Sequence, residues 1–335
     1  MPSMSAERAL VFACRGARNL IQGRPLAISL EVIHSCNCNC AHCDKGGPIP
    51  GEKLAPPERF GELVRELQPL VAQISGGEPL LRDDVFEIAR RIKPDGGLPH
   101  VVFVSNAELL TEAKYLELKR LGVDEFSISL DYPDERHDDN RGIPGLYAHL
   151  GRLLPALAAH RNHDITLISV IRRQNIDDLP ALAEHAVKWD ISINFSAYTP
   201  LRTGNADHSP RPEDLPRLRQ QIEHLIDFKR RTGRIFTTES SLWRYYDFFA
   251  RGSFLPDCRA GYRSLVVNPD GRLAPCAMQA VSFETRSELI ERFSKGNQCG
   301  GCSVSMRTNT EKSIGTLIAD AVGALGQMRR RRNGR

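Results

Sequence analysis

The sequence predicts an α/β fold, a partial (β/α)6 barrel of the TIM type followed by a small second domain that contains a β-hairpin. Short apolar runs alternate with segments of helical period from residue 26 onward, and a strong hairpin signal appears only after this alternation ends. Alternating strands and helices imply a parallel sheet with right-handed crossovers. Polar or glycine-rich motifs follow several of the apolar runs, at the strand ends where barrel sites lie.

Six apolar runs are expected to be strands. Each is short and rich in Val, Ile, Leu or Phe, as is typical of strands buried on both faces. They are 26–33, 71–75, 100–105, 125–130, 165–171 and 191–195. The segments between them with helical period are 60–70, 85–92, 112–121, 147–157 and 179–189. Asp84, Thr111 and Asp178 stand where helix N-caps are expected.

Composition indicates an ordinary globular protein, with 41% hydrophobic and 26% charged residues. No apolar run reaches the roughly 18 residues of a membrane span. Residues 1–25 carry charges among their apolar residues, which predicts a helical lead-in and not a signal peptide. We therefore expect a cytoplasmic protein without a membrane partner.

The net charge of +4 comes from the C-terminal tail, since removing the five arginines of residues 329–335 leaves a body with a net charge of −1. Such a tail can bind phosphate backbones, but solvated chain ends are common. Nucleic acid is therefore not expected as the main partner.

Nine cysteines fall into two groups, four within 36–43 and four within 258–302, with Cys14 alone. In a cytoplasmic protein this distribution indicates two metal sites more than disulfides. Cys14 is expected to be a thiol outside both sites.

The first group follows the first strand directly and contains a C-x3-C-x2-C triplet, Cys36, Cys40 and Cys43. Three thiolates on one loop can hold three irons of a 4Fe–4S cube, which leaves the fourth iron open to an exogenous ligand. Cys38 lies inside the triplet but off its spacing, and it is the alternative to Cys36 as a ligand.

This triplet after the first strand, with Gly76-Gly77-Glu78-Pro79 after the second, resembles the radical S-adenosylmethionine (SAM) enzymes. The resemblance implies that SAM binds the open iron and is cleaved reductively to methionine and a 5′-deoxyadenosyl radical, which takes a hydrogen atom from a substrate. It also implies that Gly76, Gly77 and Glu78 line the methionine end of SAM. Ser129 in Ser129-Leu130-Asp131 matches a serine of the family that contacts SAM.

Other polar residues after the strands have two readings. Ser105-Asn106 can be part of the site or a plain turn, and His137 is expected to be structural. By the same resemblance, 172–175 lies near the SAM ribose or carboxylate. The polar loop 197–212 is a candidate substrate contact, and the aromatic residues of 241–254 are expected to pack between domains.

The second group consists of Cys258 and Cys276, followed by the C-x2-C knuckle of Cys299 and Cys302. A hairpin signal at 268–271 returns the chain between the first two cysteines, so that the four thiols can meet. A structural zinc site is one interpretation. The spacing instead resembles the twitch domain, the short form of the SPASM domain, which implies an auxiliary 4Fe–4S cluster with four cysteine ligands.

The sequence is thus identified as a member of the radical SAM superfamily. Its predicted parts are a lead-in (1–25), the barrel (26–232), the auxiliary domain (233–310) and a C-terminal helix with the basic tail (311–335). The resemblance implies oxidation or bond formation on a small molecule or peptide, electron transfer by the auxiliary cluster, and an electron donor such as flavodoxin or ferredoxin. Peptide maturases often carry a leader-binding domain ahead of the barrel, and about 25 residues before the first strand are too few for one. This weakens the interpretation as a peptide maturase but leaves it open, because a separate protein can recognise the leader.

The alternative from another class is a non-catalytic zinc- or iron-binding protein that contacts RNA through its tail.

Overall fold

The computed structural model describes residues 6–93, 97–253, 258–313 and 315–316. The predicted basic tail and most of the predicted C-terminal helix lie outside these residues. One sheet of eight strands organises the chain, in the order β6-β5-β4-β3-β2-β1-β7-β8. The strands are β1 (Ala27–Ile33), β2 (Val71–Gly76), β3 (His100–Ser105), β4 (Glu125–Ser129), β5 (Ile165–Ile171), β6 (Ser192–Ala197), β7 (Ser264–Val267) and β8 (Leu273–Ala274).

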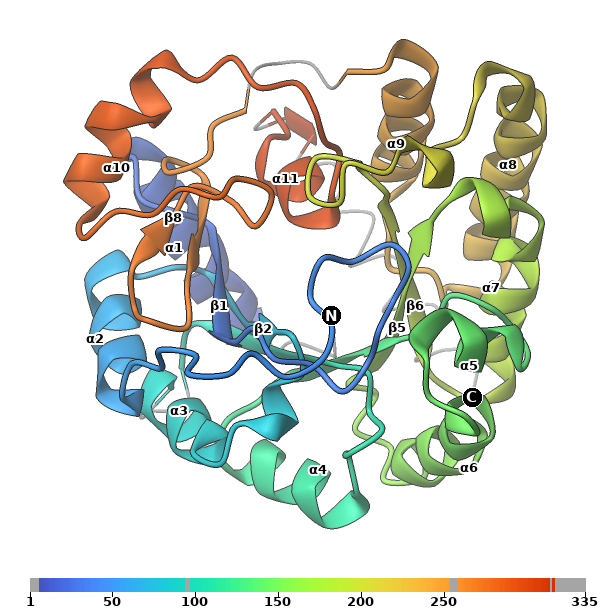
Figure 1. Ribbon diagram of the computed structural model, residues 1–335, viewed down its shortest axis with the longest axis horizontal. Helices are drawn as coiled ribbons and strands as arrows, with labels where there is room; N and C mark the ends of the chain where they lie inside the picture. Colours follow the sequence, from blue (N-terminus) through green and yellow to red (C-terminus); the bar gives the residue numbers. More distant parts are fainter. Residues whose placement is uncertain (1–5, 94–96, 254–257, 314, 317–335) are drawn as a thin grey trace.

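The first six strands are parallel, and each pairs with the next in sequence. The sheet curves, and the helices that connect its strands lie around its outside (Figure 1). These outer helices are α2 (Pro57–Leu67), α3 (Val85–Ile92), α4 (Glu112–Arg120), α6 (Leu146–Ala158), α7 (Leu179–Lys188), α8 (Leu215–Thr232) and α9 (Glu239–Arg251). The predicted partial barrel of six strand–helix units is confirmed, with a core of residues such as Ile28, Leu30 and Phe103 that are 0% exposed.

The predicted helix starts are correct, but only one of the three predicted caps acts through its side chain. The Thr111 hydroxyl accepts a hydrogen bond from the Lys114 amide at 3.3 Å. The carboxylates of Asp84 and Asp178 instead accept from Arg82 (3.1 Å) and Arg136 (2.7 Å). At both positions the carboxylate pairs with a nearby arginine, a stronger donor than a backbone amide, and does not cap the helix as the sequence pattern predicted.

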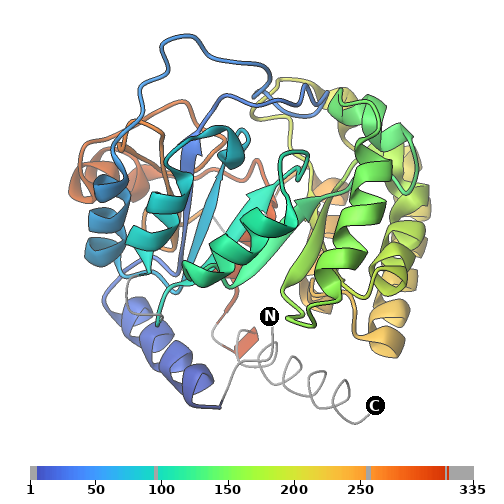
Figure 2. The same ribbon diagram turned by 90° about the horizontal axis from the view of Figure 1, so that it is seen from below.

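The predicted lead-in is the helix α1 (Ala6–Ile21). Figure 2 shows α1 at one end of the barrel and the loop that follows β1 at the opposite end. Asn19 fixes α1, because its side-chain amide donates to the carbonyls of Pro25 (2.9 Å) and Gln68 (2.8 Å). The strand ends that carry the predicted site thus stay uncovered by α1.

The predicted hairpin is β7–β8, and it continues the barrel sheet instead of forming a separate one. β7 pairs in parallel with β1, with Leu265 opposite Ile28, and β8 is antiparallel to β7. After α10 (Arg286–Arg292), the short helix α11 (Ser305–Thr310) reaches the other edge, where the Ser305 amide donates to Ser196 Oγ at 3.0 Å. The segment after β6 therefore spans from one edge of the sheet to the other.

The aromatic residues that were predicted to pack between domains lie on α9, which packs against the barrel. Tyr245 of α9 is buried, and its hydroxyl donates to the Phe195 carbonyl at 3.0 Å. Among the described helices, none combines the length and the apolar character that a membrane crossing needs.

Candidate functional site

The two glycines after β2 allow the chain to pass against the start of the cysteine loop. The Gly77 amide donates to the Ile33 carbonyl at 2.7 Å, and the Glu78 amide donates to the Ser35 carbonyl at 3.1 Å. A Cβ atom would lie 2.0 Å from the Ile33 oxygen at Gly76 and 2.1 Å from the Ser35 oxygen at Gly77. Both positions therefore require glycine because two backbone segments meet there.

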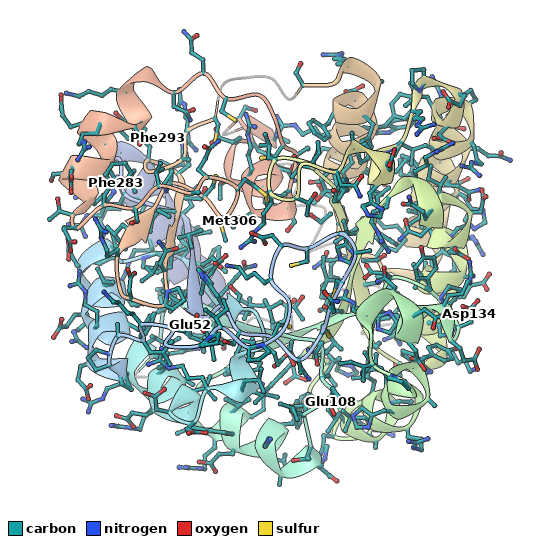
Figure 3. The ribbon with its side chains drawn as sticks, in the orientation of Figure 1. Glu52, Glu108, Asp134, Phe283, Phe293 and Met306 are labelled. Atoms are coloured by element: carbon teal, nitrogen blue, oxygen red, sulfur yellow. The ribbon has the colours of Figure 1, made fainter. Side chains whose placement is uncertain are left out.

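The turn before Cys36 is held by Glu52, whose position Figure 3 shows. One carboxylate oxygen accepts from the amide and the hydroxyl of Ser35, at 3.1 and 2.8 Å, and the other accepts from the His34 amide. The Cys36 amide then donates to the Gly47 carbonyl at 3.0 Å, which closes the cysteine loop upon itself. The loop geometry is thus set by its own backbone and by one half-buried carboxylate acceptor.

A cavity of about 310 Å³ lies under this loop, at the carboxyl ends of the parallel strands. Its wall contains the predicted ligands Cys36, Cys40 and Cys43, and also Cys38. Other strand ends contribute three of the four predicted SAM contacts, Gly76, Gly77 and Ser129, and two polar neighbours, Ser105 and Asn106. The structure therefore gathers the triplet with most of the predicted SAM contacts, and Cys38 stays an alternative to Cys36.

Glu78 is the predicted SAM contact that does not line the cavity. Its carboxylate is fully buried and accepts from Ser105 Oγ (2.9 Å), the Asn106 amide (2.8 Å) and the Leu80 amide (3.1 Å). Burial raises the pKa of this carboxyl to about 7. Here Glu78 positions the end of β3, and through it the two polar residues that do line the cavity; its contact with SAM stays a prediction.

Arg141 received no individual role from the sequence, yet it contacts the cysteine loop in two ways. Its carbonyl accepts from the Asn39 amide at 2.9 Å, and its Nη1 lies 3.6 Å from Cys40 Sγ. Its Nη2 donates to Asp131 Oδ2 at 2.6 Å. Burial opposes ionisation of Asp131, but Arg141 and His42 hold the pKa of this carboxyl well below its usual range. A buried ion pair therefore fixes the guanidinium beside the second cysteine of the triplet.

The thiols of the triplet differ in acidity. Donation from the Cys38 thiol and the charge of Arg141 lower the pKa of Cys40 to about 6, although burial opposes this shift. Burial raises the pKa of Cys43. Because thiolates are the metal-binding form of cysteine, the loop presents at least one ligand that ionises readily.

Cations line the cavity without a carboxylate among the described residues of its wall. Arg141, Lys45 and Arg202 all border it. Behind this wall, Glu31 accepts from Lys45 Nζ at 3.0 Å and lies 3.8 Å from the Arg202 guanidinium. Arg202 also pairs with Asp44, next to Cys43. A wall of four thiols and three cations suits an anionic iron–sulfur centre together with the carboxylate of SAM.

A second cavity of about 200 Å³ is lined by all four cysteines of the second group, Cys258, Cys276, Cys299 and Cys302. All four are free thiols. Met306 of α11, labelled in Figure 3, also lines this cavity. The predicted convergence of the two cysteine pairs is thus observed. No cluster of His, Cys, Asp or Glu within the described ranges is tight enough to hold a single metal ion.

The two cavities adjoin, because Met278 and Val304 line both. The loop after β6 joins them a second time: Thr199 Oγ1 donates to the Gly301 carbonyl of the knuckle at 2.7 Å. Leu201 packs on Gly301, where a Cβ atom would lie 2.9 Å from its side chain. This loop therefore contacts the knuckle while it lines the first cavity, as expected for its place at the barrel mouth.

His137 and Asn175 make internal hydrogen bonds to backbone groups, and the place of residues 172–175 near SAM stays a prediction. His137 is buried and its Nδ1 accepts from the Asp131 amide at 3.2 Å. Asn175 donates to the Asp131 and Val170 carbonyls at 3.1 and 3.0 Å. Cys14 is exposed on α1 and belongs to neither cavity.

Residues 30–186 match the family model described as the radical SAM superfamily. This part of the chain is similar to the radical SAM superfamily. The match begins in β1 and ends in α7, so it includes the cysteine triplet and the first five strands of the barrel. The radical SAM superfamily implies a 4Fe–4S cluster and SAM, and the wall of the first cavity fits both.

Curated relatives also resemble part of this chain. An AdoMet-dependent heme synthase from Methanosarcina barkeri is 32% identical over 203 residues, 58% of this chain and 56% of the relative. A GTP 3′,8-cyclase from Limosilactobacillus fermentum is 30% identical over 182 residues, 52% of this chain and 54% of the relative. The matched region thus spans about half the length of these relatives.

Solved structures resemble more of the chain at lower identity. The anSMEcpe structure with bound AdoMet matches with a TM-score of 0.61 at 17% identity, covering 80% of each chain. Streptococcus suis SuiB bound to S-adenosylmethionine matches with a TM-score of 0.60 at 15% identity, covering 85% of this chain and 70% of SuiB. At this level of identity, the similarities show that the fold is shared.

Proposed function

We propose that this radical SAM protein cleaves SAM reductively at a 4Fe–4S cluster held by Cys36, Cys40 and Cys43, and that the resulting 5′-deoxyadenosyl radical abstracts a hydrogen atom from a substrate. The observation that carries the proposal is the presence of all three thiols in the wall of one cavity at the carboxyl ends of the barrel strands. Barrel enzymes place their chemistry at this end.

The bound cluster supplies the electron for cleavage, and the chain's own residues hold and shield the reactants. Gly76, Gly77 and Ser129 line the space for SAM, and Glu78 orients the neighbouring end of β3. Arg141 places a positive charge beside Cys40. The loop after β6 covers the cavity from the side of the second cysteine group.

For the second cavity we propose an auxiliary 4Fe–4S cluster on Cys258, Cys276, Cys299 and Cys302, acting in electron transfer. With four cysteine ligands, a cube has no iron left open for substrate. The shared wall of Met278 and Val304 supports a role close to the substrate. A structural zinc at these thiols, with RNA contact through the arginine tail, is the alternative.

For the substrate we propose a small molecule or a peptide that undergoes oxidation or bond formation, with flavodoxin or ferredoxin as the electron donor. SuiB has been solved with the precursor peptide SuiA, and anSMEcpe with the Cp18Cys peptide, which supports the peptide class. The names of the curated relatives, a heme synthase and a GTP cyclase, support the small-molecule class.

The deciding experiment measures iron and sulfide per chain after anaerobic reconstitution, together with EPR spectra of the reduced protein with and without SAM. Two cubes correspond to about eight irons, with one signal that SAM shifts. Cys40→Ala should abolish the SAM-sensitive signal and SAM cleavage, while the exposed Cys14→Ala serves as the matched control. About four irons with a SAM-sensitive signal would return the second site to zinc, and no SAM-sensitive signal would overturn the enzymatic proposal.

A further inference from the structure

Six arginines lie together on a face that neither cavity uses. They come from α1, from the segment that joins it to β1, from the turn before β7 and from α10, and they are Arg15, Arg18, Arg24, Arg259, Arg263 and Arg286. All six are half-buried or exposed, and none of them lines either cavity. The face therefore suits a macromolecular partner more than an enclosed small ligand.

Neutral acceptors hold these guanidinium groups close to one another. Arg18 Nη2 and Arg24 Nη1 donate to the same oxygen, Gln68 Oε1, at 2.8 and 2.5 Å. Arg286 donates to the backbone carbonyl just before Arg24 and, at 3.1 Å, to the Gly261 carbonyl in the turn before β7. The end of α1, this turn and α10 thus form one continuous surface, which we call the arginine face.

Positive charges crowd one another on the arginine face. Burial and the charges of Arg18 and Arg24 lower the pKa of Arg15. Burial and the charge of Arg259 likewise lower the pKa of Arg263. Because a like charge acts on a pKa only at short range, these arginines are near neighbours and not scattered surface residues.

Two acids act on the arginine face without pairing with it. Glu66 raises the pKa of Arg286 and Glu311 raises that of Arg263, but neither forms an ion pair with these arginines in the described part of the chain. The Glu311 carboxylate instead accepts from the Arg259 amide at 2.8 Å, and burial raises the pKa of this carboxyl. Among the described residues, the face therefore carries more positive than negative charge.

A single turn of chain separates the arginine face from the second cavity. Cys258, Ala260 and Ser264 line that cavity, whereas Arg259, between the first two, is exposed. The Arg263 amide donates to the Arg259 carbonyl at 2.9 Å, which closes the turn. A partner bound to the arginines would therefore lie one turn of chain away from a cysteine of the second group.

We propose that the arginine face docks an acidic electron-carrier protein, which exchanges electrons with the centre held in the second cavity. The docking rests on the charge of the face, and the exchange rests on the proposed auxiliary cluster. One electron leaves the reduced carrier and enters the oxidised cluster, and no bond is formed or broken. Complementary charge speeds such an encounter and makes it sensitive to salt. The position beside Cys258 favours a redox protein over a nucleic acid as the occupant.

The test measures the binding of an acidic flavodoxin to the full-length, anaerobically reconstituted protein at low and high ionic strength. The double variant Arg18→Glu with Arg259→Glu reverses two exposed charges of the face and should weaken binding at low salt by about tenfold. Arg18→Lys with Arg259→Lys keeps both charges and should bind as the wild type does. Arg152→Glu with Lys188→Glu is the matched control, because it changes the net charge equally at exposed positions of α6 and α7, across the barrel from α10 (Figure 1).

The same variants test the electron exchange through the EPR signal that SAM does not shift. Reduced flavodoxin should generate this signal more slowly in the double glutamate variant than in the wild type. Dithionite, a small reductant that needs no docking face, should generate it at the same rate in both. A normal rate with flavodoxin despite weakened binding would overturn the exchange at this face.

The binding results decide the docking separately. Wild-type affinity in the double glutamate variant, or weakened affinity in the double lysine variant, overturns a docking face based on charge. Tighter binding of a single-stranded RNA than of flavodoxin, lost in the same glutamate variant, also overturns it, because the occupant would then be a nucleic acid. Absence of a second cluster in the wild type would refute the proposed function of that site, while the binding measurement would still decide the docking.

Discussion

Replacing Gly77 by alanine tests whether the glycines after β2 are needed to hold the cysteine loop. An added Cβ atom would lie 2.1 Å from the Ser35 carbonyl oxygen and 2.5 Å from that of His34, where such contacts essentially never fall below 3.0 Å. The φ angle of Gly77 is not in the positive range, so the effect is steric and not conformational. Relief requires the two backbone segments to separate by about 1 Å.

Overpacking of this kind costs about 1–3 kcal/mol. The hydrogen bond from the Gly77 amide to the Ile33 carbonyl, 2.7 Å long, is lost with the separation and contributes a further 0.5–1.5 kcal/mol, roughly. We therefore expect Gly77→Ala to lower the free energy of unfolding by about 2–4 kcal/mol. The displaced loop carries Cys36, so the SAM-induced change of the EPR signal should weaken as well.

The assay combines urea unfolding with EPR of the reconstituted protein. Gly151→Ala is the matched control, because this glycine lies inside α6 and its new Cβ atom would meet only Trp189, at 3.9 Å. Alanine in a helix is more favourable than glycine by about 0.5–1 kcal/mol, so the control should gain stability. Wild-type stability together with a wild-type SAM response in Gly77→Ala would refute the steric argument.

Three further predictions follow from contacts around the first cavity. Asp131→Asn breaks the buried ion pair with Arg141 and should lower the free energy of unfolding, measured in urea, by about 3–5 kcal/mol. If the double variant with Arg141→Gln loses as much stability as the two single variants together, the pairing is contradicted. In the folded protein the pKa of Glu78 is about 7, above its ordinary value of 4.5. As the pH rises from 4.5 to 7, the free energy of unfolding of the wild type should therefore fall by up to about 3 kcal/mol relative to that of Glu78→Gln. A difference that does not change with pH would count against a raised pKa. Thr199→Val removes the hydrogen bond to the Gly301 carbonyl and should lower the local stability of the knuckle by about 1 kcal/mol. Amide hydrogen exchange at 299–302 should then become about fivefold faster. Unchanged exchange would show that this bond does not hold the knuckle.

Local signals in the sequence were sufficient for the barrel. The six buried strands are short β-branched runs, and each is found within a few residues of its predicted range. The cysteine triplet was found from its spacing, and the glycine pair from its place at the end of the next strand together with the resemblance to the radical SAM family. The ends of parallel strands share one edge, so the two motifs were expected to meet. The convergence of Cys258 with Cys276 followed from the turn signal between them.

Contacts between distant segments could not be predicted in this way. Glu78 follows the glycines in sequence, but whether its carboxylate faces the cavity or β3 depends on the donors at Ser105 and Asn106, about 27 residues away. Arg141 reaches Cys40 across 101 positions of sequence. Neither periodicity nor spacing carries information about such a pair. Both residues are long or charged side chains whose partners are chosen by the folded structure.

The pairing of β7 with β1 is the most consequential contact of this kind. The sequence predicted an auxiliary domain after the barrel but no strand pairing that joins the two. In the structure, β7 is bonded to the strand that leads into Cys36, and α11 is anchored at the far edge by the Ser305 amide. Because both ends of the auxiliary segment are fixed to the same sheet, Met278 and Val304 are held in the walls of both cavities at once. The separation of the two cysteine groups is therefore set by the sheet itself. Electron transfer between a substrate in the first cavity and a centre in the second would require such a fixed separation.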